Sequence, residues 1–205
     1  MHGDVAGIVL AAGESARMEG MAKQLLRFGE RTMAAVSVAQ AEASQLDRVI
    51  VVTGRDADVV AGSLGAGRAT IVHNADYQRG NVSSLERGLA AAGDPAAVVL
   101  LLGDMPGVDR TIIDGMVEEW RRVRPWAALA VYDDGVPNHP FLLSADAIEA
   151  MRQLSGAKVL WRLLVEAPPQ PVAEVRFDRP APVDVDTPED YVAALRQMNL
   201  GSPAG

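Results

Sequence analysis

The stretch VAGIVLAAG, residues 5–13, decides the fold class of this chain. Its first seven residues are apolar or small and lack the alternation of a half-exposed strand, which indicates a strand covered on both faces. Small residues and a glycine follow directly, as in a tight turn from a strand into a helix. Apolar runs of the same kind recur at residues 48–53, 70–73 and 97–102. The pattern predicts a parallel sheet.

Segments with helical spacing separate these runs. In the third of them, Asn81 is expected to cap a helix in which Val82, Leu85 and Leu89 face the core. Alternating strands and helices predict a three-layer α/β/α, Rossmann-like fold with a mostly parallel central sheet. The expected helices in this half of the chain span residues 32–44, 56–64, 81–92 and 109–122.

The alternation loosens after about residue 126. No internal repeat or long linker interrupts the chain, so we expect a single domain over residues 1–198, followed by a flexible tail at 199–205. The expected strands of this half are 127–132, 141–144, 172–177 and 183–185, and the expected helices are 145–154, 158–166 and 188–198.

Composition excludes several classes of function. The net charge is −8 and no run of Lys or Arg stands out, which argues against a nucleic-acid partner. The chain has no cysteine, so disulfides and thiolate metal sites are excluded. No apolar run approaches the roughly 18 residues that span a bilayer. We therefore expect a cytoplasmic protein without a membrane partner.

The loop after the first strand, LAAGESARMEGMAK at residues 10–23, is the first candidate for a ligand site. It contains neither the dinucleotide fingerprint G-x-G-x-x-G nor the P-loop G-x-x-x-x-G-K-[ST]. Gly13 permits close approach of the backbone, Ser15 adds a hydroxyl, and Arg17 and Lys23 add positive charge that suits a triphosphate. An ordinary glycine turn with two solvated basic residues is the alternative.

Aspartates at strand ends indicate a metal site. Asp104 directly follows the fourth strand, and Asp184 and Asp186 lie in DVDTP near the end of the chain. Mg²⁺ commonly takes one or two carboxylates together with water and phosphate oxygens. Asp104 with Asp186 therefore predicts a Mg²⁺ site, although Asp186 is also a candidate cap for the last helix.

Other polar and aromatic residues give weaker signals. The three histidines are too widely spaced for a zinc site. The segment NHPF at residues 138–141 either lines an acceptor pocket or turns the chain, and residues 80–85 either hold a ligand or cap a helix. Core packing is the expected role of the tryptophans, Trp120, Trp126 and Trp161.

Six sequence blocks together resemble the molybdenum-cofactor nucleotidyltransferases, and most closely the molybdopterin cytidylyltransferases. They occur in the order of that family and extend over nearly the whole chain. The blocks are LAAGESARM with Lys23, VVTG (51–54), HNADYQRGNVSSL (73–85), LLGDMP (101–106), NHPFLLS (138–144) and DVDTPEDY (184–191).

The resemblance implies a Mg²⁺-dependent enzyme that transfers a nucleoside monophosphate, CMP from CTP, to the phosphate of molybdopterin or its molybdenum cofactor and releases pyrophosphate. A client molybdoenzyme is a further implied partner. The implied catalytic residues are Arg17, Lys23 and Asp104, which also contact the nucleotide. The other implied nucleotide contacts are Leu10, Ala11, Ala12, Gly13, Ser15, Asn74 and Ser84; His139 lies towards the acceptor, and Asp104 and Asp186 bind Mg²⁺.

The sequence departs from the family at three positions. Glu19 replaces a glycine, Ala75 replaces the proline of HNP, and Asn138 replaces the glycine of GHP. Ala12 resembles the cytidylyl branch, whereas relatives with LAGG use GTP. A guanylyltransferase, a sugar-phosphate nucleotidyltransferase and a non-catalytic protein that inserts the cofactor remain alternatives. A nicotinamide oxidoreductase is the weakest alternative, because the glycine fingerprint is missing.

Overall fold

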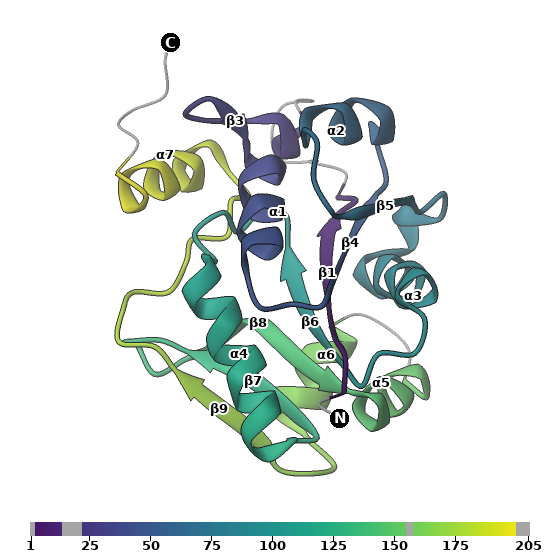
Figure 1. Ribbon diagram of the computed structural model, residues 1–205. Helices are drawn as coiled ribbons and strands as arrows, with labels where there is room; N and C mark the ends of the chain where they lie inside the picture. Colours follow the sequence, from purple (N-terminus) through teal and green to yellow (C-terminus); the bar gives the residue numbers. More distant parts are fainter. Residues whose placement is uncertain (1–2, 14–21, 155–157, 200–205) are drawn as a thin grey trace.

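The structure is a computed structural model that describes residues 3–13, 22–154 and 158–199 (Figure 1). Its centre is a seven-stranded sheet of order β5-β4-β1-β6-β8-β7-β9. Only β8 runs antiparallel to its neighbours within this sheet, which confirms the predicted, mostly parallel arrangement. The strands are β1 (Val5–Ala11), β4 (Arg48–Thr53), β5 (Thr70–His73), β6 (Ala97–Leu102), β7 (Ala127–Val131), β8 (Pro137–Ser144) and β9 (Val172–Arg176).

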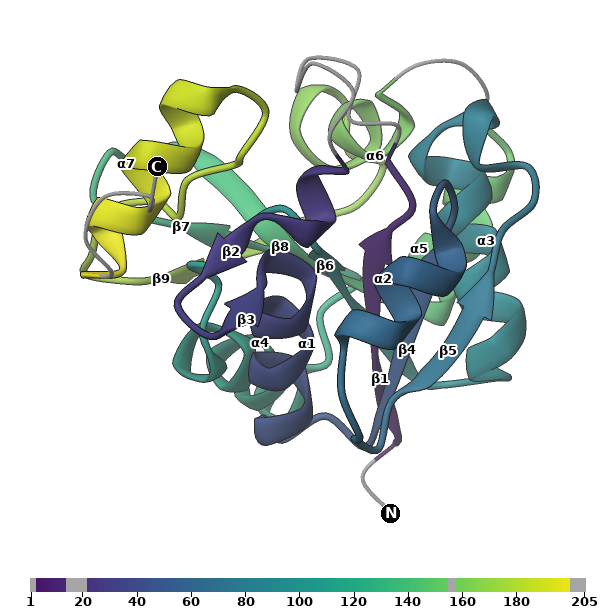
Figure 2. The same ribbon diagram turned by 90° about the horizontal axis from the view of Figure 1, so that it is seen from above.

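Helices cover both faces of the sheet, so the predicted three layers are confirmed (Figures 1 and 2). One core cluster joins the sheet to α1 (Met33–Ala43), α2 (Ala57–Ser63) and α4 (Arg110–Val123). A second cluster on the opposite face joins it to α3 (Asn81–Ala92), α5 (Ala145–Arg152) and α6 (Val159–Trp161). The remaining elements are η1 (Lys23–Leu25), β2 (Arg27–Phe28), β3 (Arg31–Thr32), η2 (Tyr77–Arg79), η3 (Arg162–Glu166) and α7 (Pro188–Gln197).

Three local expectations were wrong or incomplete. The N-cap of α3 is Gly80, whose φ of 93° suits glycine, and Asn81 is the first helical residue. Residues 183–185 form no strand; the N–H of Val185 instead donates to the carbonyl of Asp104, beyond the end of β6. The short hairpin of β2 and β3 was not predicted.

The strand order places one crevice at the carboxyl edge of the sheet. From β1 the chain passes to β4 and β5 on one side, and it then returns to β6 on the other side of β1. Ligands of open α/β sheets bind where the strand order reverses in this way. Because β8 is antiparallel, with Phe141 opposite Leu100, it begins at the edge where β6 ends. The ends of β1 and β6 and the start of β8 therefore surround this crevice.

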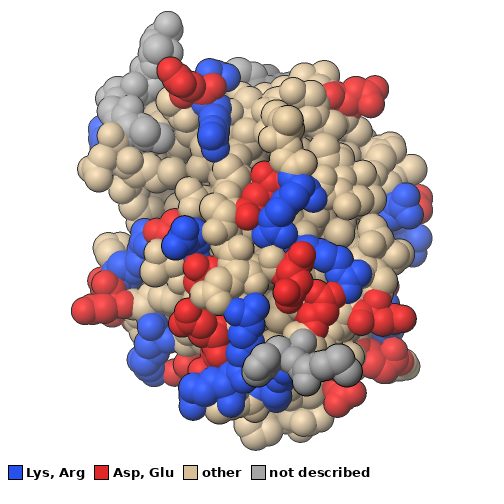
Figure 3. Space-filling model, in the orientation of Figure 1, with Lys and Arg blue, Asp and Glu red and all other residues tan. Residues whose placement is uncertain are grey.

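The surface agrees with the charge pattern of the sequence. Figure 3 shows Lys and Arg interspersed with Asp and Glu, and no broad basic area appears among the described residues on that face. Within the described chain, none of the helices is both long and apolar enough to cross a membrane.

Candidate active site

Asp104 stands directly beyond the end of β6, against the end of β1. The N–H of Gly103 donates to the carbonyl of Leu10 over 2.9 Å. A Cβ at position 103 would lie 3.0 Å from that same oxygen, so glycine is needed for this close approach. The two strand ends are thereby locked together, and the carboxylate of Asp104 lies beside the loop that follows β1.

Two further carboxylates arrive from the segment before α7. The N–H of Val185 donates to the backbone carbonyl of Asp104 over 3.0 Å, and the Val185 side chain is buried. This anchor brings the flanking Asp184 and Asp186 to Asp104, so that ligand oxygens of all three lie within 4.8 Å of one another. The cap of α7 is Thr187, in a capping box with Asp190, which leaves the Asp186 carboxylate at the cluster.

Lys23 meets this acidic cluster from the other side. It begins η1, and its side chain is only 10% exposed. Its Nζ lies 2.6 Å from Asp104 Oδ2 and donates to Asp186 Oδ1 over 2.8 Å. Lys23 and Asp186 are 163 residues apart in the chain, and the fold joins them in one ion-pair network.

The cluster is electrostatically suited to a divalent cation. Burial, followed by the charges of Asp104 and Asp186, raises the pKa of Asp184 to about 6. Burial opposes the charged form of Lys23, but the two carboxylates outweigh it and raise the pKa of Lys23. Asp104 Oδ1 is buried without a hydrogen-bond partner among the described residues. Crowded carboxylates with a spare buried oxygen match the ligand set of Mg²⁺ or Mn²⁺.

The start of the β1 loop lies beside this cluster. Leu10 and Ala11 end β1, Ala12 is buried, and Gly13 is exposed. Gln24 donates from Nε2 to the carbonyl of Gly13 over 3.2 Å, which connects the loop to η1. Three residues singled out from the sequence, Ser15, Arg17 and Glu19, lie outside the described residues.

Asn74 and Ser84 are brought together, as the resemblance implied. Asn74 is buried at the end of β5, and its Nδ2 donates to the hydroxyls of Ser83 and Ser84, each over 3.0 Å. Its backbone N–H donates to the carbonyl of Thr53 over 2.8 Å. Asn74 therefore fixes the start of α3 relative to the ends of β4 and β5.

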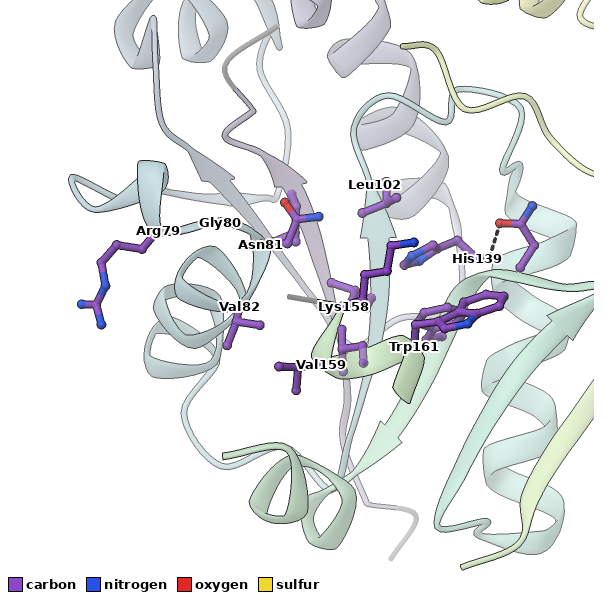
Figure 4. Close-up of a pocket in the computed structure, with 14 residues that line it drawn as sticks. Arg79, Gly80, Asn81, Val82, Leu102, His139, Lys158, Val159 and Trp161 are labelled. Atoms are coloured by element: carbon purple, nitrogen blue, oxygen red, sulfur yellow. Dashed lines mark hydrogen bonds between the residues drawn. The ribbon is translucent and has the colours of Figure 1, made fainter. Parts of the chain in front are cut away.

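A cavity of about 840 Å³ opens between α3, α6 and the strands β1, β6 and β8 (Figure 4). Its walls are mostly apolar, with a few polar groups at the rim, as in sites for organic ligands. Trp161 packs on the core, as predicted, and it also lines this cavity. The lining residues are Leu10, Arg79, Gly80, Asn81, Val82, Leu100, Leu102, Asn138, His139, Phe141, Lys158, Val159, Leu160 and Trp161.

His139 lies on the wall of this cavity near the start of β8. Its ring stacks on Phe141 with 3.9 Å between the ring centroids, and its carbonyl accepts from the Tyr132 hydroxyl over 2.8 Å. Its Nδ1 atom is buried and has no partner among the described residues. Burial lowers the pKa of His139 from 6.5 to about 4, against a hydrogen bond with the Leu100 backbone that raises it.

We therefore expect His139 to stay uncharged throughout the neutral range. Between about pH 6.5 and pH 4 the unfolded chain takes up a proton at this position and the folded chain does not, so His139 lowers stability as the pH falls through that window. NMR titration of the histidine ring carbons measures the pKa of His139 directly. A His139 pKa near 6.5 would contradict the expectation.

The family can be assigned once this geometry is compared with known proteins. The sequence model of the MobA-like NTP transferase domain family matches residues 7–172 of this chain. This range contains most of the described sheet and its helices. The chain belongs to this family. It is therefore an enzyme of the nucleotidyltransferase class, as the sequence blocks indicated.

Relatives of this MobA-like chain cover almost its whole length. The molybdenum cofactor cytidylyltransferase of Escherichia coli (strain K12) is 29% identical over 91% of this chain and 93% of its own length. A homologue of Rv0371c from Mycobacterium sp. strain JC1 is 32% identical over 95% of this chain and 96% of its own, with a TM-score of 0.82. Rv0371c of Mycobacterium tuberculosis H37Rv, in a complex with manganese, is 28% identical over 94% and 98%, with a TM-score of 0.78.

In this MobA-like domain, sequence reasoning found the charged residues of the ion-pair network and missed a lysine at the cavity. Lys23, Asp104 and Asp186 are in contact, although the sequence alone did not pair Lys23 with the aspartates. Lys158 was not singled out, and it lines the cavity from a left-handed backbone conformation, φ 54°. Lys158 precedes the apolar run 159–161, and neither its spacing nor its charge marks it in the sequence.

Proposed function

We propose that this MobA-like enzyme transfers CMP from CTP to the phosphate of molybdopterin or its molybdenum cofactor, with Mg²⁺, and releases pyrophosphate. The observation that carries this proposal is the convergence of Lys23 with Asp104, Asp184 and Asp186 beside the β1 loop. A cation and a group of carboxylates at one strand edge are the parts that phosphoryl-transfer chemistry requires. The large cavity next to them provides room for an organic acceptor.

Asp104 and Asp186, with Asp184 beside them, would hold the divalent cation. Bound there, the cation would neutralise triphosphate oxygens and make the α-phosphorus more electrophilic. An acceptor phosphate oxygen attacks that phosphorus, the bond to the β-phosphate breaks, and pyrophosphate leaves. Lys23 stabilises the negative charge of the leaving pyrophosphate, and Arg17 holds the triphosphate with it. The protein otherwise aligns the two reactants.

The nucleotide would lie along the end of β1. Backbone groups of residues 10–13, with Ser15, contact base and ribose, while Asn74 orients Ser84 at the start of α3. Two considerations favour CTP over GTP: Ala12 in the loop and the E. coli relative, which is a cytidylyltransferase. A guanylyltransferase or a sugar-phosphate nucleotidyltransferase would share all of these residues except the base contacts.

The acceptor would bind in the cavity, with His139 on one wall and Trp161 on another (Figure 4). An indole offers a flat apolar surface for a heterocycle, and neutral His139 offers a hydrogen-bonding nitrogen. Lys158 and Asn138 at the same wall add a cation and an amide. These side chains support the proposal of an acceptor with a ring and polar edges.

Truncating Trp161 tests the acceptor site. We expect Trp161→Ala to raise the KM for molybdopterin about tenfold, because an aromatic contact is lost, and to leave the KM for CTP within about twofold. Steady-state kinetics with each substrate varied in turn provide both constants, and Trp161→Phe serves as the conservative control. An equal change in both constants, or in neither, would contradict the placement of the acceptor.

Pyrophosphate release tests the function as a whole. The purified chain is incubated with Mg²⁺, molybdopterin with or without molybdenum, and CTP, GTP, ATP or UTP in turn. Release with CTP alone supports a cytidylyltransferase, and release with GTP alone supports the guanylyl alternative. If the folded protein binds nucleotide but releases no pyrophosphate with any of them, the catalytic proposal fails in favour of an accessory protein.

A further inference from the structure

The cation of Lys23 contacts two of the three carboxylates of the cluster. Its Nζ contacts Asp104 Oδ2 at 2.6 Å and Asp186 Oδ1 at 2.8 Å. Oxygens of these residues and of Asp184 lie within 4.8 Å of one another, which is the spacing of ligands around one divalent ion. The ammonium group therefore binds two of the carboxylates that a metal ion would need.

A metal ion bound to this carboxylate cluster would lie close to the positive charge of Lys23. An ammonium group and a divalent cation that share carboxylates repel each other strongly in a partly buried site, where screening by water is weak. The long, flexible side chain of Lys23 can relieve this repulsion by moving its ammonium away from the two carboxylates.

We propose that Lys23 has two positions in the working cycle. In the metal-free protein its ammonium holds Asp104 and Asp186 together in place of a divalent cation, and when the metal binds, it leaves them for the triphosphate of the nucleotide. Its first position rests on the contacts described above. Its second position rests on the proposed function, since only a nucleotide supplies the triphosphate.

This exchange couples metal binding to nucleotide binding. A metal ion that arrives alone must displace Lys23 from Asp104 and Asp186, and it offers the ammonium no new anionic partner. A nucleotide that accompanies the metal offers phosphate oxygens to the released ammonium. Each ligand therefore strengthens the binding of the other, and by thermodynamic linkage the two effects are equal in size. Lys23 is thus a positioning residue for the carboxylates as well as a phosphate contact.

The affinity for Mn²⁺ without nucleotide tests the competition. We expect Lys23→Met to bind Mn²⁺ at least about tenfold more tightly than the natural protein, since two charge-assisted hydrogen bonds no longer have to be broken. Lys23→Arg keeps the charge and should stay within about threefold of the natural protein. Arg122→Met on the exposed surface of α4 is the matched control for loss of a cation elsewhere. Equal affinity of Lys23→Met and the natural protein would overturn the proposal.

Movement of Lys23 is tested separately, because simple repulsion would also change the affinity. The chain contains only two lysines, Lys23 and Lys158, so nitrogen-labelled lysine gives two side-chain NMR signals that are assigned with the Lys23→Met variant. Titration with Mg²⁺ alone should shift the Lys23 signal with the midpoint of metal binding and speed hydrogen exchange of its ammonium about tenfold. A Lys23 ammonium that keeps its signal and its slow exchange at saturating Mg²⁺ would overturn the proposal.

Addition of a non-hydrolysable CTP analogue should then slow the exchange of Lys23 again, as the triphosphate becomes its partner. Unchanged fast exchange with the analogue bound would overturn the second position. Neither the Mn²⁺ affinity nor the Mg²⁺ titration involves turnover. Failure to release pyrophosphate would therefore refute the proposed function and leave the metal-free position of Lys23 standing, so the two failures are distinguishable.

Discussion

Replacing Asp104 with alanine should lower the rate of pyrophosphate release by about 100-fold or more while the fold survives. The substitution removes one carboxylate of the cluster and an ion-pair partner of Lys23. The backbone carbonyl of Asp104, which accepts from Val185, is retained, so the last segment should stay attached. Turnover at saturating CTP is measured over a range of Mg²⁺ concentrations.

Asp94 provides the matched control for this change. It is an exposed aspartate in the loop before β6, at the opposite end of that strand from Asp104. Asp94→Ala removes the same charge and should turn over like the natural enzyme, and the circular dichroism of both variants checks the fold. Near-normal turnover of Asp104→Ala in saturating Mg²⁺ would show that Asp104 is not a required metal ligand.

Lys23→Ala should also lower turnover by about 100-fold or more, for a different reason. The substitution leaves carboxylates for the metal but removes the cation that stabilises the leaving pyrophosphate. We therefore expect the loss mainly in kcat for CTP, and Mg²⁺ in excess should not restore it. In the metal-free variant the three carboxylates lose their counter-ion, so its melting temperature should fall and added Mn²⁺ should recover it.

Arg122→Ala is the control for the loss of a cation, because Arg122 lies on the exposed face of α4 in a pair with Glu119. It should leave kcat unchanged and shift the melting temperature little. A Lys23→Ala variant with normal kcat, or one that excess Mg²⁺ restores completely, would show that Lys23 acts only on the carboxylates. The proposal that Lys23 stabilises the negative charge of the leaving pyrophosphate would then be wrong.

Local sequence signals were enough to predict the first half of the fold. The run of apolar residues in β1, and its repetition at β4, β5 and β6, predicted the parallel sheet within the residues that the structure describes; β1, β4 and β6 are largely buried, whereas β5 is a mostly exposed edge strand. A strand that is apolar on both faces has few other environments. Because parallel strands end at one edge, the same pattern placed the β1 loop and Asp104 together. Family resemblance added the roles of these residues.

The arrangement of the second half depended on tertiary structure. The segment 183–185 has the composition of a strand, but it meets the chain beyond the end of β6. The hydrogen bond from Val185 to Asp104 and the buried Val185 side chain help to place its carboxylates. Likewise His139, near the start of β8, lies at the crevice only because β8 runs antiparallel to β6. The start of β8 therefore lies beside the end of β6.

The sequence by itself determined the parallel sheet, the loop after β1 and the family, because burial period and turn residues are local properties. Only the tertiary structure decided that Lys23 contacts Asp104 and Asp186, and that Trp161 lines a cavity as well as packing on the core. Contacts between residues so far apart depend on which strand edges and helix faces remain unoccupied when the rest has packed. No local sequence pattern predicts which strand edges and helix faces remain unoccupied.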